Sequence, residues 1–166
     1  WNSREKPEDD DTLTPAESRA PSLRRSTDVE HLSLSHRPTS KIDSLLVDDH
    51  AMVRQGLRSV LEHYDDVAVV GEASTGREAI EFVERLRPAV VVMDINMPET
   101  NGIDATIEIK ARHPDVAVIG LSVHNTAEAR EAMLQAGATT LLSKESAVDE
   151  LYAAIRQALA DEGVPR

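Results

Sequence analysis

Five short apolar segments, each followed by a helical pattern, most constrain what this chain can fold into. The expected strands are Ser44–Asp48, Val67–Gly71, Ala89–Asp94, Val116–Ser122 and Thr139–Ser143. Strands that alternate with helices are typical of βα units and a parallel sheet. The segment before Asp94, AVVVM, is apolar throughout, as expected of a central strand covered on both faces. The sequence therefore predicts an α/β fold with a doubly wound, five-stranded parallel sheet.

Apolar residues between these strands recur at helical spacing, so five helices are expected beside the sheet. The clear stripes are Val53, Leu57, Val60, Leu61 and Tyr64, then Ala79, Ile80, Val83 and Leu86, and last Val148, Leu151, Ile155 and Leu159. A weaker stripe comprises Ala129, Ala132, Met133 and Ala136. The remaining helix, from about Gly102 and including Ile107, has the least regular pattern. Pro88 and Pro114 lack an amide donor and are expected to end the helices before two strands.

The amino-acid composition of the chain changes near Lys41. Residues 1–41 mix Ser, Thr, Pro and charged residues, with apolar residues that follow no period. Such a segment buries too little apolar surface to offset the entropy of ordering it. The sequence predicts a disordered linker or tail over 1–41, a folded domain over 42–160 and a short C-terminal tail over 161–166.

The net charge of −12 lies almost wholly after residue 41, because residues 1–41 carry eight acidic and seven basic side chains. A domain this acidic repels nucleic acids and anionic lipid as a whole. The chain has no cysteine, no apolar run long enough to span a bilayer and no signal-peptide pattern at its start. We expect a cytoplasmic protein without nucleic-acid or membrane partners, whose metal ligands, if any, are oxygen atoms.

Acidic residues follow two of the predicted strands. In a sheet with strand order 2-1-3-4-5, the ends of the first and third strands border the crevice where the order reverses, and these ends carry Asp48, Asp49 and Asp94. Three carboxylates there repel one another unless a cation joins them. An all-oxygen cluster suits Mg²⁺, which is often shared with a phosphate. The segment VDDHAMVRQG contains no glycine-rich nucleotide-binding pattern, so the cluster predicts a magnesium site.

Two further polar residues end the fourth and fifth strands, on the same edge. Ser122 and Lys144 could bind the oxygens of a phosphoryl group attached to Asp94, which would then be the nucleophile. Each residue taken alone has a plainer interpretation: Asp49 as a helix cap, Ser122 as a loop hydroxyl and Lys144 as a solvated lysine. The functional interpretation depends on the whole set falling at the ends of four strands. The six histidines show no zinc-binding spacing, and His50 and His124 beside the cluster are interpreted as residues of its rim.

Four segments, LLVDDH, VVVMDINMPETNG, VIGLS and LLSK, resemble the receiver domain of bacterial two-component response regulators, most closely the NarL/FixJ type. The resemblance covers roughly residues 42–160 and includes the spacing of Pro98 and Gly102 after Asp94. It implies a flavodoxin-like sheet of order 2-1-3-4-5 flanked by five helices. It also implies that a sensor histidine kinase or phosphotransfer domain donates a phosphoryl group to Asp94.

The same resemblance implies roles for individual residues. Asp48, Asp49 and Asp94 would hold Mg²⁺ together with the backbone carbonyl of Asn96, while Ser122 and Lys144 would contact the phosphoryl group. Phosphorylation in this family remodels the face made by the fourth helix, fifth strand and fifth helix, which is also a possible homodimer interface. The protein would assist its own phosphorylation and dephosphorylation without turning over a substrate.

One position departs from the family pattern. Three residues before Lys144, where receivers often have Tyr or Phe, this chain has Leu141. An aromatic side chain that reports phosphorylation is therefore absent, and we expect switching to depend on Ser122 and on the loop after the fourth strand. Asn96 and His124, each two residues beyond a site residue, are expected to control the lifetime of the phosphoryl group.

Two other functions stay open from the sequence. A receiver can serve as an unphosphorylated docking module, although retention of all five site residues argues against it. A haloacid-dehalogenase-like phosphatase would have its nucleophile and acidic partner together as DxD after the first strand, whereas here DIN follows the third strand and the acidic pair follows the first. NarL/FixJ-type regulators usually carry a helix-turn-helix domain, and the residues after Leu159 are too few for one. Because the chain begins with Trp1, we expect a piece of a longer protein, for example a receiver behind a sensor kinase.

Overall fold

The computed structural model describes residues 40–163, which are built around a parallel five-stranded sheet of order β2-β1-β3-β4-β5. The strands are β1 Ile42–Val47, β2 Val67–Ala73, β3 Val90–Asp94, β4 Ala117–Ser122 and β5 Thr140–Ser143. The predicted flavodoxin-like order is confirmed, and each strand end lies within about two residues of its predicted position. The linker or tail expected over 1–41 lies outside the described residues, apart from its last two.

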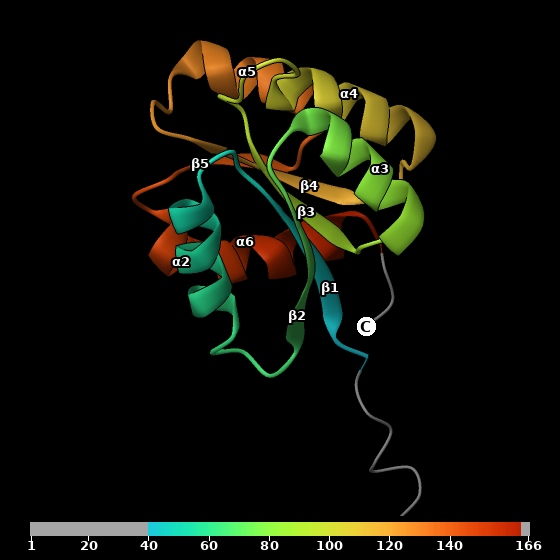
Figure 1. Cartoon of the computed structure of the whole chain (residues 1–166), viewed down its shortest axis with the longest axis vertical. Coiled ribbons are helices and arrows are strands. Elements are labelled where there is room, and N and C mark those ends of the chain that lie inside the picture. Colours follow the sequence, from blue (N-terminus) through green and yellow to red (C-terminus); the bar gives the residue numbers. More distant parts are fainter. Residues whose placement is uncertain (1–39, 164–166) are drawn as a thin grey trace, which may run out of the picture. The chain divides into compact units, whose positions relative to one another are not determined.

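Five helices connect and flank the strands within the described range. They are α2 Ala51–Leu61, α3 Gly76–Leu86, α4 Gly102–Arg112, α5 Ala127–Gln135 and α6 Ala147–Asp161. Helices α2 and α6 cover one face of the sheet, and α3, α4 and α5 cover the other (Figure 1). None of these helices is long and apolar enough to cross a lipid bilayer. Of the expected tail over 161–166, Asp161 ends α6, and residues 164–166 lie outside the described range.

Alternate side chains of the strands enter two separate cores. In β3, Val91 and Met93 pack under α3, α4 and α5, whereas Val90 and Val92 pack against α2 and α6. All five residues of β3 are buried, which confirms the prediction of a central strand covered on both faces. Since both cores run along β3, the position of its last residue, Asp94, is fixed from both sides of the sheet.

Polar side chains fix where three of the helices begin. Thr75, Asn101 and Thr126 precede α3, α4 and α5, and each side chain accepts hydrogen bonds from backbone N–H groups of the first turn. Such caps satisfy donors that have no partner within the helix. The residues at the corresponding positions of α2 and α6, His50 and Ser146, make no side-chain cap bond.

One sequence-based assignment of a core residue is wrong. Val148 was placed on the buried stripe of α6 but is 59% exposed, because the stripe begins one residue earlier and comprises Ala147, Leu151, Ile155 and Ala158. Ile107 of α4 is likewise exposed, and the buried face of this helix consists of Ala105, Thr106 and Ile109. Small residues on that face explain why the hydrophobic pattern of α4 was irregular.

Gly102, the first residue of α4, lies directly against the end of β3. A Cβ atom at this position would overlap the backbone carbonyl oxygen of Asp94. The Gly102 N–H also donates to the Ile95 carbonyl at 3.2 Å. A side chain here would therefore displace either the helix or the residue that ends the strand, and neither backbone can move without disturbing the core.

Replacing Gly102 with alanine is expected to lower the free energy of unfolding by about 1–3 kcal/mol, because the added methyl group meets backbone atoms. Gly56→Ala is the matched control, since a Cβ at Gly56 meets nothing within 4 Å. Gly56 lies inside α2, so its replacement should raise stability by up to about 1 kcal/mol through helix propensity. Urea unfolding followed by circular dichroism measures both, and equal effects of the two changes would contradict this account.

Candidate phosphoacceptor and metal site

Asp94 is the last residue of β3, and its side chain is fully buried. Its Oδ1 atom accepts a hydrogen bond of 3.1 Å from the backbone N–H of Asn96. The next residue continues the sheet pattern, because the Ile95 N–H donates to the Leu121 carbonyl at 3.0 Å. The carboxylate is thus presented at the carboxyl edge of the sheet by backbone that is bonded on both sides.

Asp48 and Asp49 follow β1, the strand adjacent to β3. The Asp48 carboxylate is fully buried, whereas a quarter of the Asp49 side chain is exposed. Asp48 Oδ1 accepts a hydrogen bond of 2.8 Å from the His50 N–H. Asp48 is therefore held firmly in the interior, and Asp49 lies nearer the solvent.

Lys144 joins the two buried carboxylates. Its Nζ lies 2.7 Å from Asp48 Oδ2 and 3.2 Å from Asp94 Oδ2. The residue follows β5, and its backbone N–H donates to the Ser122 carbonyl at 2.9 Å. The structure thus brings together four sequence-predicted residues from three strand ends, and Lys144 is not a solvated surface lysine.

Burial and the charges of this cluster change the pKa values of Asp94 and Lys144. Burial raises the pKa of Asp94, and the nearby Asp48 carboxylate adds to this effect, although the Asn96 N–H and Lys144 oppose it. Burial alone would lower the pKa of Lys144, but Asp48 and Asp94 together raise it. The ammonium therefore stays charged, while the negative charge on Asp94 is unfavourable in the folded protein.

Two further predicted site residues, Ser122 and Asn96, border the carboxylates, and their predicted roles toward a phosphoryl group and Mg²⁺ stay predictions. Ser122 is buried at the end of β4, but its hydroxyl donates to the His124 carbonyl at 2.8 Å and accepts from the His124 N–H at 3.1 Å. Asn96 contacts Asp94 through its backbone N–H. Both residues border the cluster, and the hydroxyl of Ser122 is engaged by its own loop.

Two arginines that support this edge of the sheet were missed by the sequence reasoning. Arg54 on α2 donates to the Asp48 carbonyl at 2.6 Å and to Glu72 Oε2 at 3.0 Å. Arg130 on α5 donates to the Leu141 carbonyl at 3.0 Å. Both bind backbone carbonyl groups, for which no side-chain motif exists in the sequence.

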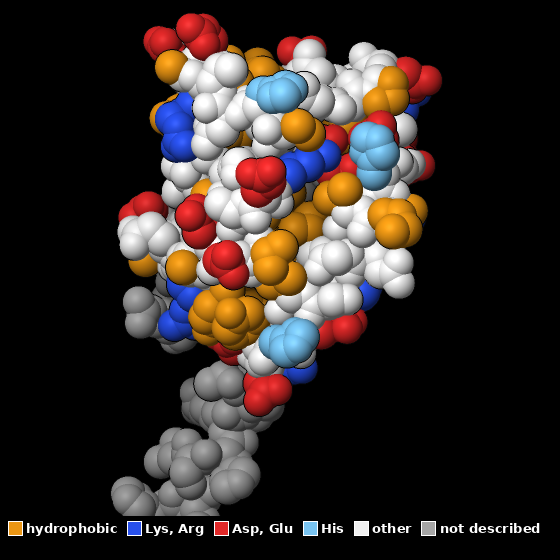
Figure 2. Space-filling view, turned by 90° about the vertical axis from the view of Figure 1, so that its left-hand side faces the viewer, with side chains coloured by type: hydrophobic (Ala, Val, Ile, Leu, Met, Phe, Trp, Pro, Cys, Tyr) orange, Lys and Arg blue, Asp and Glu red, His pale blue; other side chains and the backbone are white. Residues whose placement is uncertain are grey.

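The donor atoms suit a hard divalent cation. Asp48 Oδ2 and Asp94 Oδ2 are buried and share the single Lys144 ammonium, at 2.7 and 3.2 Å, while Asp49 Oδ1 lies 3.1 Å from His50 Nδ1. Carboxylate oxygens and a backbone carbonyl are ligands that Mg²⁺ takes, with water completing its shell. The carboxyl ends of the strands lie at the left of Figure 1, and Figure 2 shows that face, where basic and acidic side chains meet in a small area bordered by histidine and hydrophobic side chains.

Without divalent ions, Asp94→Asn is expected to raise the free energy of unfolding by on the order of 1 kcal/mol, since it removes an unfavourable buried charge. The pKa of Asp94 is raised in the folded protein, so this penalty is present at neutral pH. It should vanish as the pH falls and the carboxyl becomes protonated in both states. Thermal unfolding in EDTA across a pH series measures the difference between variant and wild type.

Asp115→Asn is the control, because Asp115 is exposed in the turn before β4, and its replacement should change stability by less than about 0.5 kcal/mol. Added Mg²⁺ should then stabilise the wild type more than Asp94→Asn, since it binds the folded site. A less stable Asp94→Asn protein at neutral pH in EDTA would show that Lys144 fully compensates the buried charge.

Comparison with known proteins agrees with this geometry. The family model described as the response regulator receiver domain matches residues 44–156. The chain is 43% identical over 115 residues to the response regulator UvrY of Escherichia coli K12, covering 69% of this chain and 53% of UvrY. It is 38% identical over 117 residues to the transcriptional regulatory protein DegU of Brevibacillus brevis, covering 70% and 50%. The chain thus spans about half the length of these curated relatives.

Solved structures show the same fold. The response regulator domain of Thermotoga maritima CheB aligns with a TM-score of 0.68 and 34% identity, covering 72% of this chain and 97% of that domain. The receiver domain of the putative regulator NarL from Mycobacterium tuberculosis aligns with a TM-score of 0.67 and 27% identity, covering 76% and 99%. By sequence, sheet order and the acidic cluster at the ends of β1 and β3, the chain belongs to the response regulator receiver family.

Proposed function

We propose that residues 42–160 act as a phosphorylation-dependent switch in two-component signalling, with Asp94 as the phosphoacceptor. The donor would be a phosphohistidine of a sensor histidine kinase or phosphotransfer domain in the cytoplasm. The observation that carries this proposal is the buried Asp94 carboxylate, which lies 3.2 Å from Lys144 Nζ beside the carboxylate of Asp48. Family membership supports it, since receivers are signalling modules of this kind.

The transfer needs a nucleophile and compensation of charge. An oxygen of the Asp94 carboxylate forms a bond to phosphorus while the bond from phosphorus to the histidine nitrogen breaks, and the imidazole keeps that electron pair and takes up a proton. Lys144 Nζ, already within reach of Asp94, would bind a phosphoryl oxygen. Mg²⁺ held by Asp48, Asp49, Asp94 and the Asn96 carbonyl would supply charge neutralisation at the phosphoryl oxygens.

Ser122 supports a switch through the loop after β4. Its hydroxyl is bonded to the N–H and carbonyl of His124, so it can turn toward a phosphoryl group on Asp94 only by releasing that loop. The binding energy of the phosphoryl group would thus be coupled to the conformation of residues 123–126. Switching through Ser122 and this loop would replace the aromatic residue that receivers often have at the position of Leu141.

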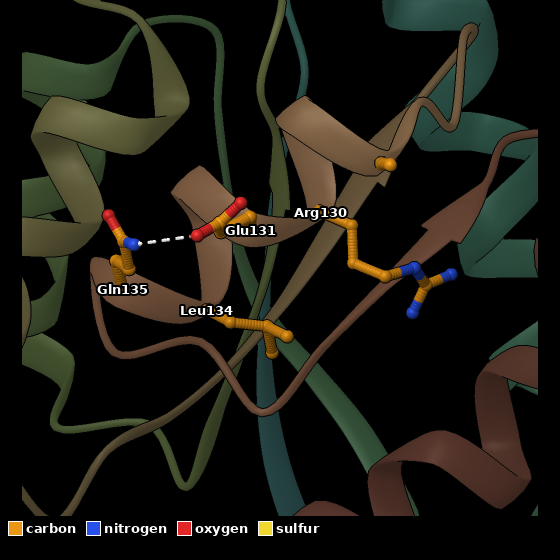
Figure 3. Close-up of a pocket in the computed structure, with 5 residues that line it drawn as sticks. Arg130, Glu131, Leu134 and Gln135 are labelled. Atoms are coloured by element: carbon orange, nitrogen blue, oxygen red, sulfur yellow. Dashed lines mark hydrogen bonds between the residues drawn. The ribbon is translucent and has the colours of Figure 1, made fainter.

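Leu141 and Arg130 indicate how this movement would reach β5. Leu141 is fully buried, and its side chain fills the space over Gly120, the residue paired with it in β4. The Arg130 guanidinium bonds the Leu141 carbonyl at 3.0 Å and Asn125 Oδ1 at 3.4 Å. In Figure 3 Arg130 points away from Glu131 and Gln135, its neighbours on α5. The Arg130 side chain therefore connects the loop after β4 to β5. We assign to it the role of transmitting a movement of that loop to β5.

The other functions fit less well. A phosphatase has no support from the comparisons, and we expect no turnover of a substrate beyond the loss of the protein's own phosphoryl group. An unphosphorylated docking module would not need Asp48, Asp49, Asp94 and Lys144 gathered at one edge. The predicted homodimer face corresponds to α5, β5 and α6 of Figure 1, and we keep it as a proposal because it includes Arg130 and the strand that precedes Lys144.

Incubation with Mg²⁺ and acetyl phosphate should add one phosphoryl group to the wild-type protein and none to Asp94→Asn, as measured by intact mass. Lys144→Ala should take up phosphate more slowly, because the ammonium that faces Asp94 is lost. Asp115→Asn is the control and should match the wild type. A wild-type protein that gains no phosphate mass under conditions that phosphorylate another receiver would refute the proposal.

Arg130→Gln should uncouple β5 from the phosphorylation site. With beryllium fluoride as phosphoryl mimic, backbone NMR shifts should still change at Ser122, while the changes at Leu141 shrink, with a loss of coupling of about 0.5–2 kcal/mol. Glu131→Gln is the matched control, since Glu131 bonds Gln135 on the same helix. Equal responses of β5 in both variants would exclude Arg130 as the connection.

Substitutions at Asn96 or His124 should change the lifetime of the phosphoryl group more than its uptake. Both side chains are exposed at the edge of the cluster, where they can limit the approach of water to phosphorus. Decay of the phosphorylated protein after removal of acetyl phosphate measures the lifetime, and the initial gain in mass measures uptake. Parallel changes in both rates would contradict a role confined to hydrolysis.

A further inference from the structure

His50 lies against the acidic cluster, at the start of α2. Its Nδ1 atom lies 3.1 Å from Asp49 Oδ1 and 3.2 Å from Asp48 Oδ1. The residue precedes α2 but makes no side-chain cap bond to that helix. Its position is fixed by the bond from its N–H to Asp48 Oδ1. The imidazole is thus turned toward the carboxylates rather than toward the free amides of the helix.

The cluster then offers a nitrogen as well as oxygens. Asp48, Asp49, His50 and Asp94 each provide one ligand atom, and all four atoms lie within 4.8 Å of one another. Metal–ligand bonds of about 2.0–2.2 Å keep the ligands of one ion within roughly 4.4 Å, so a small closure of the cluster is sufficient. Three carboxylates converge here, while the Lys144 ammonium faces only those of Asp48 and Asp94, and this excess of negative charge is further support for a cation at this position.

We propose that His50 Nδ1 is a nitrogen ligand of this site and that it raises the affinity for divalent ions of the first transition row relative to that for Mg²⁺. The inference rests on the cation site of the proposed function. A neutral imidazole adds no charge, and Mg²⁺ prefers oxygen ligands and retains its water, so His50 contributes little to its binding. Imidazole does suit ions such as Co²⁺ and Zn²⁺. His50 is therefore a determinant of metal selectivity.

The side chain is accessible for this role. It is 65% exposed, whereas Asp48 beside it is fully buried, so an ion that arrives from solvent meets the imidazole and the partly exposed Asp49 before the buried carboxylates. The ion would share the carboxylates of Asp48 and Asp94 with the Lys144 ammonium. Replacement of an exposed side chain should leave the fold intact, which makes the proposal testable by substitution.

Co²⁺ is the probe, because its paramagnetism shifts the N–H proton of a coordinated imidazole far outside the ordinary NMR range. The full chain is titrated with Co²⁺ and, separately, with Mg²⁺ by calorimetry, as wild type, His50→Gln and His63→Gln. His63 is the control, since it lies beyond the other end of α2. We expect the shifted proton in wild type and His63→Gln only. In His50→Gln the affinity for Co²⁺ should fall about 10–100-fold, while that for Mg²⁺ changes less than about twofold.

The outcomes separate this inference from the proposed function. A His50→Gln protein that keeps the shifted proton and its Co²⁺ affinity would overturn the inference, as would equal losses of affinity for both ions, which would mean that His50 only positions Asp48. Wild-type protein that binds Co²⁺ through His50 but not Mg²⁺ would support the inference and contradict the magnesium site of the proposed function. Failure to bind either ion would overturn both.

Discussion

The ion pairs of Lys144 with Asp48 and Asp94 are the interaction on which the rest of the structure depends. Two fully buried carboxylates are brought to adjacent strand ends, and their desolvation and mutual repulsion oppose folding. The compensating ammonium comes from beyond β5, the last strand in the sheet. The repulsion between the charges at the ends of β1 and β3 is therefore partly offset only when the whole sheet, through to its edge, has assembled.

This requirement explains why the domain combines an unfavourable polar edge with two well-packed cores. Both faces of β3 are covered, and β4 is also buried at every position. The apolar packing supplies the stability that the site removes, and it also keeps the strand ends in register. Gly102 shows how tight this arrangement is, because the start of α4 approaches the carbonyl of Asp94 too closely for any side chain.

The sequence predicted the sheet and most of the site because each strand end carries its own local signature. An apolar run such as AVVVM indicates a buried strand without any knowledge of its neighbours in the fold. Because Asp94 comes directly after that run, its place at the end of the strand could be predicted. The prediction for Val148 was wrong because the spacing of apolar residues locates the buried face of a helix only to within about one residue. Here Ala147 occupies the buried position, and Val148 beside it is exposed. Arg130 could not be predicted, since its partner is the carbonyl of Leu141 and only the fold brings them together. The absence of an aromatic residue at 141 was visible in the sequence, but the fit of Leu141 over Gly120 was not.

The short length of β5 has a consequence for how the edge of the sheet opens. This strand has four residues and pairs with β4 alone, so its backbone contributes few bonds to hold it in place. Lys144, the next residue, adds an electrostatic anchor that reaches across β4 to β3 and β1. Any cation or anion that competes for this ammonium or for its two carboxylates changes the free energy of local unfolding at β5. Amide hydrogen exchange along Thr140–Ser143 is thereby linked to the ionic state of carboxylates at the ends of β3 and β1, which are not adjacent to β5 in the sheet.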